Sequence, residues 1–233
     1  NRFSLLFTVD HVAGSLARLG HSVLCIDMDI GLRNLDITLG MTDAALMDFS
    51  DVMAGRCDLS RAAVPHPTVS GLHLLTAPLT LPGDFPGEAG FQALLQQARE
   101  AYDYVLIDSP AGLGPGFRLA VCGADRAIVV AVSDPSSLRD AQRVVTQLSQ
   151  LEPIHLVVNR VRPRLLRRQN TTIDDAIDEA GLPLLGVIPE DENVPAILGR
   201  GLSQRLKYHS GALCACENIA RRLCGERVRL MRL

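Results

Sequence analysis

Lysine and tryptophan are nearly absent from this sequence, and so are long apolar runs. Of the 23 lysine and arginine residues only Lys207 is a lysine, there is no tryptophan, and aromatic residues make up 4% of the chain. No run of about 18 apolar residues occurs, so the sequence offers no candidate for a membrane-spanning helix. The formal net charge of −3 excludes a protein that is basic throughout, although it leaves room for a local basic patch.

The six cysteines lack the paired spacing that is typical of redox or zinc sites. No C-x-x-C pair occurs, and Cys25 and Cys122 lie in apolar runs, where a thiol behaves as a small hydrophobic group. Cys214, Cys216 and Cys224 lie close together in the sequence, but no second pair or histidine cluster accompanies them. We therefore expect buried, reduced thiols in a cytoplasmic protein without a signal peptide.

Short apolar runs alternate with amphipathic stretches along the 233 residues. Continuous apolar strands separated by helices are typical of a parallel sheet that is covered on both faces. The sequence therefore predicts one α/β domain over residues 1–233, with a doubly wound, mostly parallel sheet flanked by helices on both faces. The expected strands are residues 22–28, 72–77, 102–108, 126–132, 154–159 and 183–189. The expected helices are residues 10–19, 43–54, 88–101, 135–151, 171–180, 192–199 and 211–224.

Polar residues follow five of the expected strands at the point where each strand ends. In an open α/β sheet, ligands bind outside the carboxyl ends of the strands. Because parallel strands bring these ends to one edge, we expect a single site there. The residues are Asp27 and Asp29, Asp108 to Pro110, Ser133 and Asp134, Asn159 and Arg160, and Pro189 to Asp191.

The segment YVLIDSPAG, residues 104–112, has the form of a Walker B segment. In such a segment Asp108 would bind a hydrated magnesium ion, and the small residues up to Gly112 would let the backbone approach a γ-phosphate. An aspartate at this place can also be a helix N-cap or a turn residue, which leaves the segment alone ambiguous.

The segment CIDMDIGLRNLD, residues 25–36, adds a second acidic strand end with Asp27 and Asp29. A D-x-D spacing also occurs in glycosyltransferases, where it holds a metal and a nucleotide sugar. That function does not predict a further acidic strand end at Asp108 followed by S-P-A-G, so it ranks as a distant second. A third alternative is that the two acids only organise the backbone of a tight turn.

Two further strand ends carry residues suited to a nucleotide base. In LVVNRVRP, residues 156–163, the amide of Asn159 could pair with an adenine edge through both its donor and its acceptor. In LLGVIPED, residues 184–191, the loop at Pro189 could pack against the base. Taken singly, each is better explained as an ordinary loop.

Together, several segments resemble, in order and spacing, the MinD-type septum-site-determining ATPases of the MinD/ParA branch of P-loop proteins. The resemblance covers about Val12 to Arg200, and DIGLRNLD, DSPAG and NRVRP are its most specific parts. It implies an ATP-driven dimer that positions the division septum by recruiting an inhibitor to the membrane. The segments are IDMDIGLRNLD, GRC, YDYVLIDSPAGL, GFRLAVCGADRAIVV, PSSLRDAQRV, VVNRVRP and PLLGVIPEDE.

The resemblance also implies ATP and Mg²⁺ as cofactors and a role for each matching residue. Asp29 would orient the water that attacks the γ-phosphate, with Asp27 near the magnesium shell. Asp108 would hold the metal through water, and Gly112 would lie in the switch segment after it.

The remaining matches concern the base and the partners. Asn159 would recognise adenine, and Pro189 would lie against the base. The segment SDPSSLRD falls where the family forms its homodimer and contacts a MinC-like division inhibitor and a MinE-like or equivalent topological factor. Asp134, Ser137 and Asp140 are the candidate contact residues there. A plain N-cap with an amphipathic helix face is the alternative for this segment.

The phosphate-binding loop of such an ATPase is missing from this sequence. The family begins with a strand, a glycine-rich loop containing lysine and a hydroxyl residue, and a helix. Counting back from Gly20, the lysine position falls near Leu5 and the hydroxyl near Leu6, and no glycine precedes Gly14. Residues 1–11 are interpreted as a degenerate or truncated start; alternatively, FSLLFTV retains the first strand of a pseudo-ATPase, a non-hydrolysing interaction protein. In both cases we expect poor ATP binding and negligible hydrolysis.

Two basic segments bear on membrane and nucleic-acid binding. The tail at residues 225–233 mixes arginines with apolar residues that do not gather on one helical face, so it predicts only weak contact with an anionic membrane. Five arginines lie within residues 159–170, and a ParA-like DNA segregation ATPase, the third hypothesis, would use them to bind DNA. Because a solvated loop explains them more simply and aromatic residues are missing there, nucleic-acid binding is not expected. The expected location is cytoplasmic, with peripheral contact at the inner face of the cell membrane.

Overall fold

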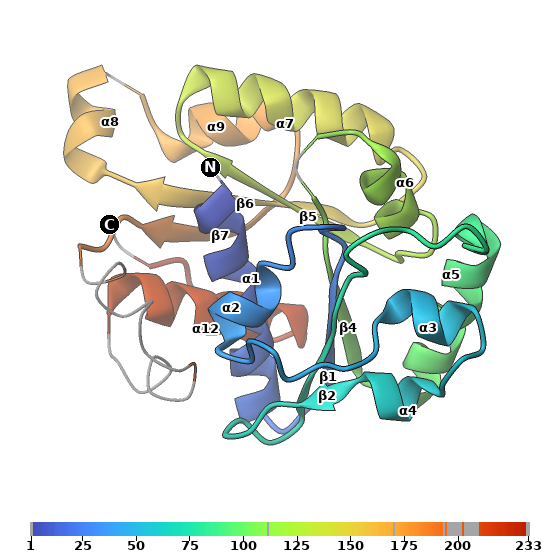
Figure 1. Cartoon of the computed structure of the whole chain (residues 1–233). Helices are drawn as coiled ribbons and strands as arrows, with labels where there is room; N and C mark the ends of the chain where they lie inside the picture. Colours follow the sequence, from blue (N-terminus) through green and yellow to red (C-terminus); the bar gives the residue numbers. More distant parts are fainter. Residues whose placement is uncertain are drawn as a thin grey trace. The chain divides into compact units, whose positions relative to one another are not determined.

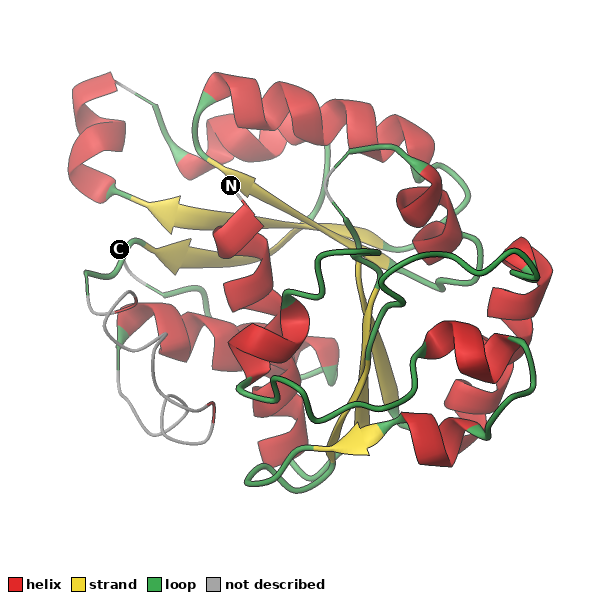
Figure 2. Cartoon of the chain, in the orientation of Figure 1, coloured by secondary structure: helices red, strands yellow, loops and turns green. Residues whose placement is uncertain are grey.

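The computed structural model describes residues 2–110, 112–169, 171–192, 194, 202 and 210–231, with only the backbone for residues 2–7 and 169. The chain divides into two compact units. The first comprises the described residues up to Gly123, and the second comprises most of the described residues from Ala124 onward. In both units strands alternate with helices along the chain (Figures 1 and 2).

The first unit is built on a four-stranded sheet in the order β2-β3-β1-β4, in which β1 is parallel to β3 and β4 and β2 is antiparallel to β3. β1 lies between two strands and is buried at every position, as expected for the apolar run VLCI. Its residues Leu24 and Ile26 belong to the core that also contains Phe49 and Phe91. The elements are α1 (Arg2–Arg18), β1 (Val23–Asp27), α2 (Leu35–Leu39), α3 (Phe49–Met53), α4 (Leu59–Ala62), β2 (Val64–Pro65), β3 (Leu72–Leu75), α5 (Gly87–Ala101), β4 (Tyr104–Asp108) and α6 (Pro115–Val121).

The second unit is built on a three-stranded parallel sheet in the order β5-β6-β7. Helices α7 and α9 lie on one face of this sheet and α12 lies on the other (Figure 1). Gly186 in β7 allows α12 to approach, because a Cβ at this position would lie 2.8 Å from Cδ1 of Ile219 and closer still to its Cγ1. The elements are β5 (Ala127–Val132), α7 (Pro135–Gln147), β6 (Ile154–Val161), α8 (Pro163–Gln169), α9 (Ile173–Ala180), β7 (Leu184–Pro189) and α12 (Gly211–Leu223).

Side-chain caps determine where several helices begin. The Asp48 side chain accepts hydrogen bonds from the backbone N–H groups of Ser50 and Asp51, and the Asp51 side chain accepts one from the N–H of Asp48. This capping box starts α3 at Phe49, so the expected helix over residues 43–54 is shorter than predicted. Because helix N-termini leave backbone donors without intrahelical partners, such caps decide a boundary that apolar periodicity alone does not show.

The structure confirms the predicted α/β class, and each of the six expected strands is present. The hypothesis that FSLLFTV keeps a first strand is wrong, because residues 2–18 form one helix. No glycine or proline precedes Gly14, so nothing in the sequence ends this helix early. The short elements β2, α2, α4, α6 and α8 were not expected from the sequence. The expected helix over residues 192–199 lies largely outside the described residues.

Candidate functional site

The carboxylate of Asp27 organises the turn that follows β1. Asp27 is fully buried, with 0% of its surface exposed. Its Oδ1 accepts a hydrogen bond from the N–H of Asp29 at 2.8 Å, and its Oδ2 accepts one from the N–H of Leu35 at 3.2 Å. Hydrogen bonds to backbone N–H groups stabilise an ionised carboxylate in an apolar environment. One function of this acid is therefore to connect the end of β1 to the start of α2.

Residues 28–34, here named the Asp29 loop, are held by further hydrogen bonds. Oδ2 of Asp29 accepts one from Nδ2 of Asn34 at 3.0 Å, and the Asp29 carbonyl accepts from the N–H groups of Leu32 and Arg33 at 3.1 and 3.2 Å. The N–H of Gly31 donates to the carbonyl of Pro78 at 3.1 Å, which ties the loop to the segment after β3. Gly31 has a φ of +90°, a conformation that suits glycine. The loop therefore presents Asp29 on a well-defined backbone.

Asp108 ends β4 beside Asp27. The two residues are partners in the parallel pairing of β1 with β4, and the N–H of Met28 donates to the carbonyl of Asp108 at 3.0 Å. Asp108 is 5% exposed and Asp29 is 7% exposed. Gly112 follows with a φ of +88°, again a conformation for which glycine is suited. The structure thus brings the acidic ends of two neighbouring strands together within the first unit.

Asn159 lies near the end of β6, two residues before Val161, and Pro189 ends the neighbouring strand β7. Asn159 is 2% exposed, and its Oδ1 accepts a hydrogen bond from the N–H of Arg160 at 2.6 Å. The N–H of Glu190 donates to the carbonyl of Val161 at 2.9 Å, which joins the loops after β6 and β7. Asn159 and Pro189 therefore lie at the same edge of the three-stranded sheet.

An ionic contact strengthens the connection between these two loops. The Glu190 carboxylate accepts hydrogen bonds from Nη2 of Arg160 and from Nη2 of Arg162, each at 2.8 Å. Arg160 has a φ of +54°, which is uncommon for a residue with a side chain. The sequence did not point to Glu190 as a residue that holds the loop containing Asn159.

The three predicted contact residues of α7 have different surroundings. Oδ1 of Asp134 accepts hydrogen bonds from the N–H groups of Ser136 and Ser137 at 3.1 Å, so Asp134 is the N-cap of α7. The hydrogen bond from the Ser136 hydroxyl lowers the pKa of Asp134. Oγ of Ser137 accepts from the N–H of Val132 at 3.1 Å, and exposed Asp140 forms an ion pair with Arg143 at 3.3 Å. The first two residues thus have roles within the fold, and their part in partner contacts stays a prediction.

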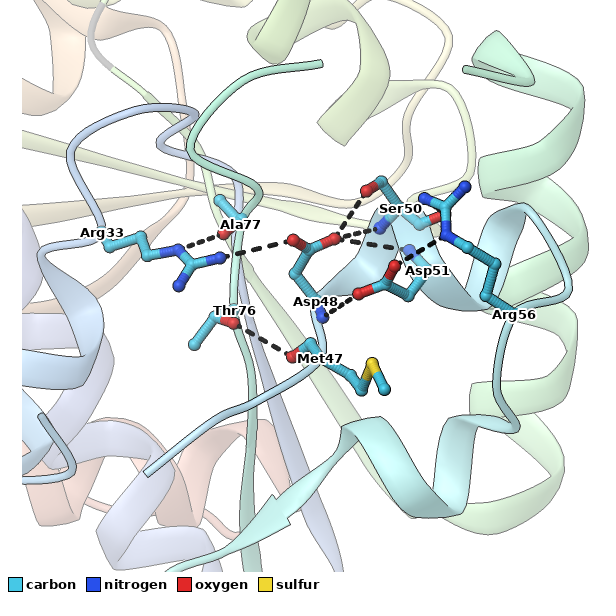
Figure 3. A network of polar contacts seen from close by, with 8 residues as sticks. All are labelled: Arg33, Met47, Asp48, Ser50, Asp51, Arg56, Thr76 and Ala77. Atoms are coloured by element: carbon cyan, nitrogen blue, oxygen red, sulfur yellow. Dashed lines mark hydrogen bonds and ion pairs between the residues drawn. The ribbon is translucent and has the colours of Figure 1, made fainter. Parts of the chain in front are cut away.

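Sequence reasoning missed Arg33 and Asp48, whose contact connects the Asp29 loop to the start of α3 (Figure 3). Nε of Arg33 donates to the carbonyl of Ala77 at 2.5 Å, and its Nη2 donates to Oδ2 of Asp48 at 3.3 Å. The D-x-x-D pattern of Asp48 and Asp51 could have revealed the capping box. Nothing local to the sequence indicates that Arg33 contacts it.

The predicted site residues belong to two units. Asp27, Asp29, Asp108 and Gly112 lie in the first, and Asn159 and Pro189 lie in the second. Within the described part of the chain, no group of three or more histidine, cysteine, aspartate or glutamate side chains is arranged to hold a metal ion directly. This finding concerns direct metal ligands, whereas Asp108 is expected to hold magnesium through water.

The helices of the described residues include none that is long and apolar enough to cross a membrane. After α12 the chain turns at Gly225, which has a φ of +86°, and residues 226–231 are not helical. Arg222 of α12 donates to the carbonyls of Val228 and Arg229 at 3.1 and 2.9 Å and to that of Leu185 in β7 at 3.0 Å. These bonds hold the described part of the tail near the end of α12.

Comparison with known proteins places this geometry in a family. Residues 7–204 match the CobQ/CobB/MinD/ParA nucleotide binding domain. The chain is 36% identical over 228 residues to the septum site-determining protein MinD of Bacillus subtilis, which covers 96% of this chain and 85% of that protein. The MinD cell division protein of Aquifex aeolicus has a TM-score of 0.84 and 32% identity, over 98% of this chain and 94% of that chain. A chain of the MinC:MinD cell division protein complex from Aquifex aeolicus has a TM-score of 0.87 and 33% identity, over 97% of this chain and 93% of that one.

Proposed function

Because the chain belongs to the MinD septum site-determining proteins of the CobQ/CobB/MinD/ParA nucleotide-binding family, we propose that it regulates where the division septum forms. The observation that carries this proposal is the pairing of Asp27 with Asp108 at the ends of neighbouring parallel strands, with Asp29 two residues further on. Buried acids at the carboxyl edge of a parallel sheet suit a hydrated magnesium ion and a nucleotide phosphate.

In this proposal each strand-end residue has one role. Asp108 holds magnesium through water with Asp27 near the metal shell, Asp29 orients the attacking water, and Gly112 lies in the adjoining switch. Asn159 recognises adenine with Pro189 against the base. The bound Mg²⁺ would neutralise phosphate charge, and the hydrogen bonds of Asp27 and Asn34 would keep the Asp29 loop in position.

The residues before Val12 do not fit the phosphates of ATP. A phosphate is bound by free backbone N–H groups of a glycine-rich loop and by a lysine. Here residues 2–18 form one helix, whose interior N–H groups bond within the helix, and no lysine occurs before Lys207.

We therefore propose that the chain as given binds ATP weakly and hydrolyses it negligibly. A charge-assisted hydrogen bond contributes about 1.5–3 kcal/mol. The loss of two such bonds lowers affinity by about two to four orders of magnitude. Dimerisation driven by ATP would weaken accordingly.

The proposed partners are a second copy of the chain, a MinC-like division inhibitor and a MinE-like or equivalent topological factor. A relative that forms a complex with MinC supports the choice of inhibitor. Asp134, Ser137 and Asp140 at the start of α7 are the proposed contact residues. Peripheral contact with an anionic membrane through the basic, apolar tail completes the proposal, and the expected location is the cytoplasm and the inner face of the cell membrane.

Calorimetric titration with ATP and magnesium tests the nucleotide half of this proposal. The chain as given is compared with a chimera whose residues before Thr8 are replaced by the corresponding segment of the Bacillus subtilis relative. We expect saturable binding and turnover by the chimera and an affinity at least 100-fold weaker for the chain, which is about 2.7 kcal/mol. Equal affinities would overturn the assignment of weak binding. No binding by a folded chimera would overturn the nucleotide site itself.

A second candidate function is a non-hydrolysing interaction protein, and the continuous helix α1 favours it. The two functions differ in whether the inhibitor binds without nucleotide. Purified MinC of Aquifex aeolicus, titrated into the chain without ATP, should bind only if this second function is right. Asp140→Ala tests whether this binding uses the proposed contact surface, because Asp140 is exposed and its ion pair with Arg143 contributes little to stability.

A further inference from the structure

Arg33 has no part in the proposed chemistry, yet it has specific partners on two other segments of the first unit. Its side chain is 25% exposed, and that of Asp48, which it contacts, is 15% exposed. The residue has a φ of +45°, a left-handed conformation that residues with a side chain rarely adopt. Such a conformation persists where surrounding contacts hold it.

The guanidinium connects the Asp29 loop to two elements that are distant in sequence. Nε donates to the carbonyl of Ala77, just after β3, and Nη2 donates to Oδ2 of Asp48, just before α3 (Figure 3). Ala77 is 44 residues away from Arg33 and Asp48 is 15 residues away. A planar guanidinium presents its donors in a fixed geometry, so the two contacts together define the direction in which the loop leaves β1.

The two carboxylate oxygens of Asp48 have different hydrogen-bond partners. Oδ1 caps α3 by accepting from the N–H and the hydroxyl of Ser50 and from the N–H of Asp51, while Oδ2 accepts from Arg33. The position of α3 is in turn fixed by Phe49, which is fully buried. The cap therefore offers Arg33 an acceptor whose carboxylate is oriented by the hydrogen bonds of its other oxygen.

We propose that Arg33 is a positioning residue that holds the Asp29 loop in the conformation that presents Asp29 and Asn34. The contact with Ala77 fixes the side of the loop that faces β3, and the contact with Asp48 fixes it against α3. The consequence for water orientation rests on the proposed function of Asp29, whereas the effect on the loop does not.

The network continues from Asp48 to a more exposed end. Nε of Arg56 donates to Oδ1 of Asp51 at 2.8 Å, and its Nη1 donates to Oδ2 of Asp84 at 3.3 Å (Figure 3 shows the Asp51 contact). Asp84 is 67% exposed, so this last pair is screened by water. The same change, aspartate to asparagine, can therefore be made at Asp48 and at Asp84. Only the change at Asp48 should affect the Asp29 loop.

Amide hydrogen exchange of the full chain, followed by NMR, tests the proposal without nucleotide. The reporters are the N–H groups of Leu32 and Arg33, which donate to the Asp29 carbonyl. We expect Arg33→Met to speed their exchange at least tenfold, which is about 1.4 kcal/mol, while amides of β1 change less than twofold. Arg33→Lys should give an intermediate rate, because an ammonium keeps the charge but lacks the fixed pair of donors.

Asp48→Asn tests the same contact from its other side. Asparagine is as good an N-cap as aspartate, so α3 is retained while the charged acceptor for Arg33 is lost. We expect faster exchange at Leu32, no additional effect when Asp48→Asn is combined with Arg33→Met, and no effect of Asp84→Asn. Exchange at Leu32 that is unchanged in Arg33→Met, or that rises together with the β1 amides, would overturn the proposal.

A kinetic measurement separates positioning of Asp29 from a merely structural role. In the chimera with the relative's phosphate loop, Arg33→Met should lower kcat at least tenfold and change KM less than threefold. A chimera that shows no turnover would contradict the proposed function, whereas the exchange experiment would still decide the role of Arg33. Normal kcat in Arg33→Met would overturn positioning for catalysis.

Discussion

Replacing Asp27 with asparagine is the most direct test of the role that the structure gives this acid. The two oxygens of Asp27 accept hydrogen bonds from the N–H groups of Asp29 and Leu35, and the side chain is fully buried. Asparagine keeps the shape of the side chain but has one oxygen, so an NH₂ group must face one of the two N–H donors.

The expected loss follows from these contacts. A hydrogen bond to a charged group contributes about 1.5–3 kcal/mol, and an unsatisfied buried donor costs about 1–3 kcal/mol. Because the terms overlap, we expect Asp27→Asn to lower the free energy of unfolding by about 3 kcal/mol. A loss of this size is a large part of the stability of an ordinary domain.

Urea unfolding at neutral pH, followed by circular dichroism, measures this loss with and without magnesium. The matched control is Asp43→Asn, an exposed position with a φ of +60° that asparagine tolerates, and it should change stability by less than about 0.5 kcal/mol. If Asp27 organises the turn, the loss appears without magnesium. A magnesium-free Asp27→Asn variant as stable as the native chain would refute this reasoning.

Two further outcomes are expected from single residues. Gly186→Ala should lower the free energy of unfolding by about 1–3 kcal/mol, because the new Cβ would overlap Ile219, whereas Gly83→Ala should have little effect because nothing lies within 4 Å. Equal losses in thermal unfolding of the two variants would contradict the packing argument. Burial lowers the pKa of His73 from its ordinary 6.5. The stability that neutral His73 contributes is therefore present above the unfolded-state pKa, and it is lost as the pH falls through the folded-state pKa. His73→Gln should therefore lose less stability than the native chain between about pH 7 and about pH 5, measured as urea midpoints, and an equal loss would contradict it.

Most of the strands were predictable because each is a continuous apolar run. VLCID and AIVVAV carry their own signal, since a strand covered by helices on both faces needs apolar residues at successive positions. Helix boundaries were less predictable, and α3 shows why. The apolar pattern over residues 43–54 fits a helix throughout, but the Asp48 side chain caps the backbone and starts the helix six residues later, at Phe49.

The amino-acid order was sufficient to identify the acidic strand ends and the family, because both are recognised from short segments, each of which is continuous in the chain. The contacts of Arg33 with Ala77 and Asp48, and those of Glu190 with Arg160 and Arg162, depend instead on which strands are neighbours. Sheet order and register are set by the packing of the whole unit, so no local pattern specifies them. The sequence left open whether Asp27 organises a tight turn, and the structure shows that its carboxylate accepts hydrogen bonds from the N–H groups of Asp29 and Leu35.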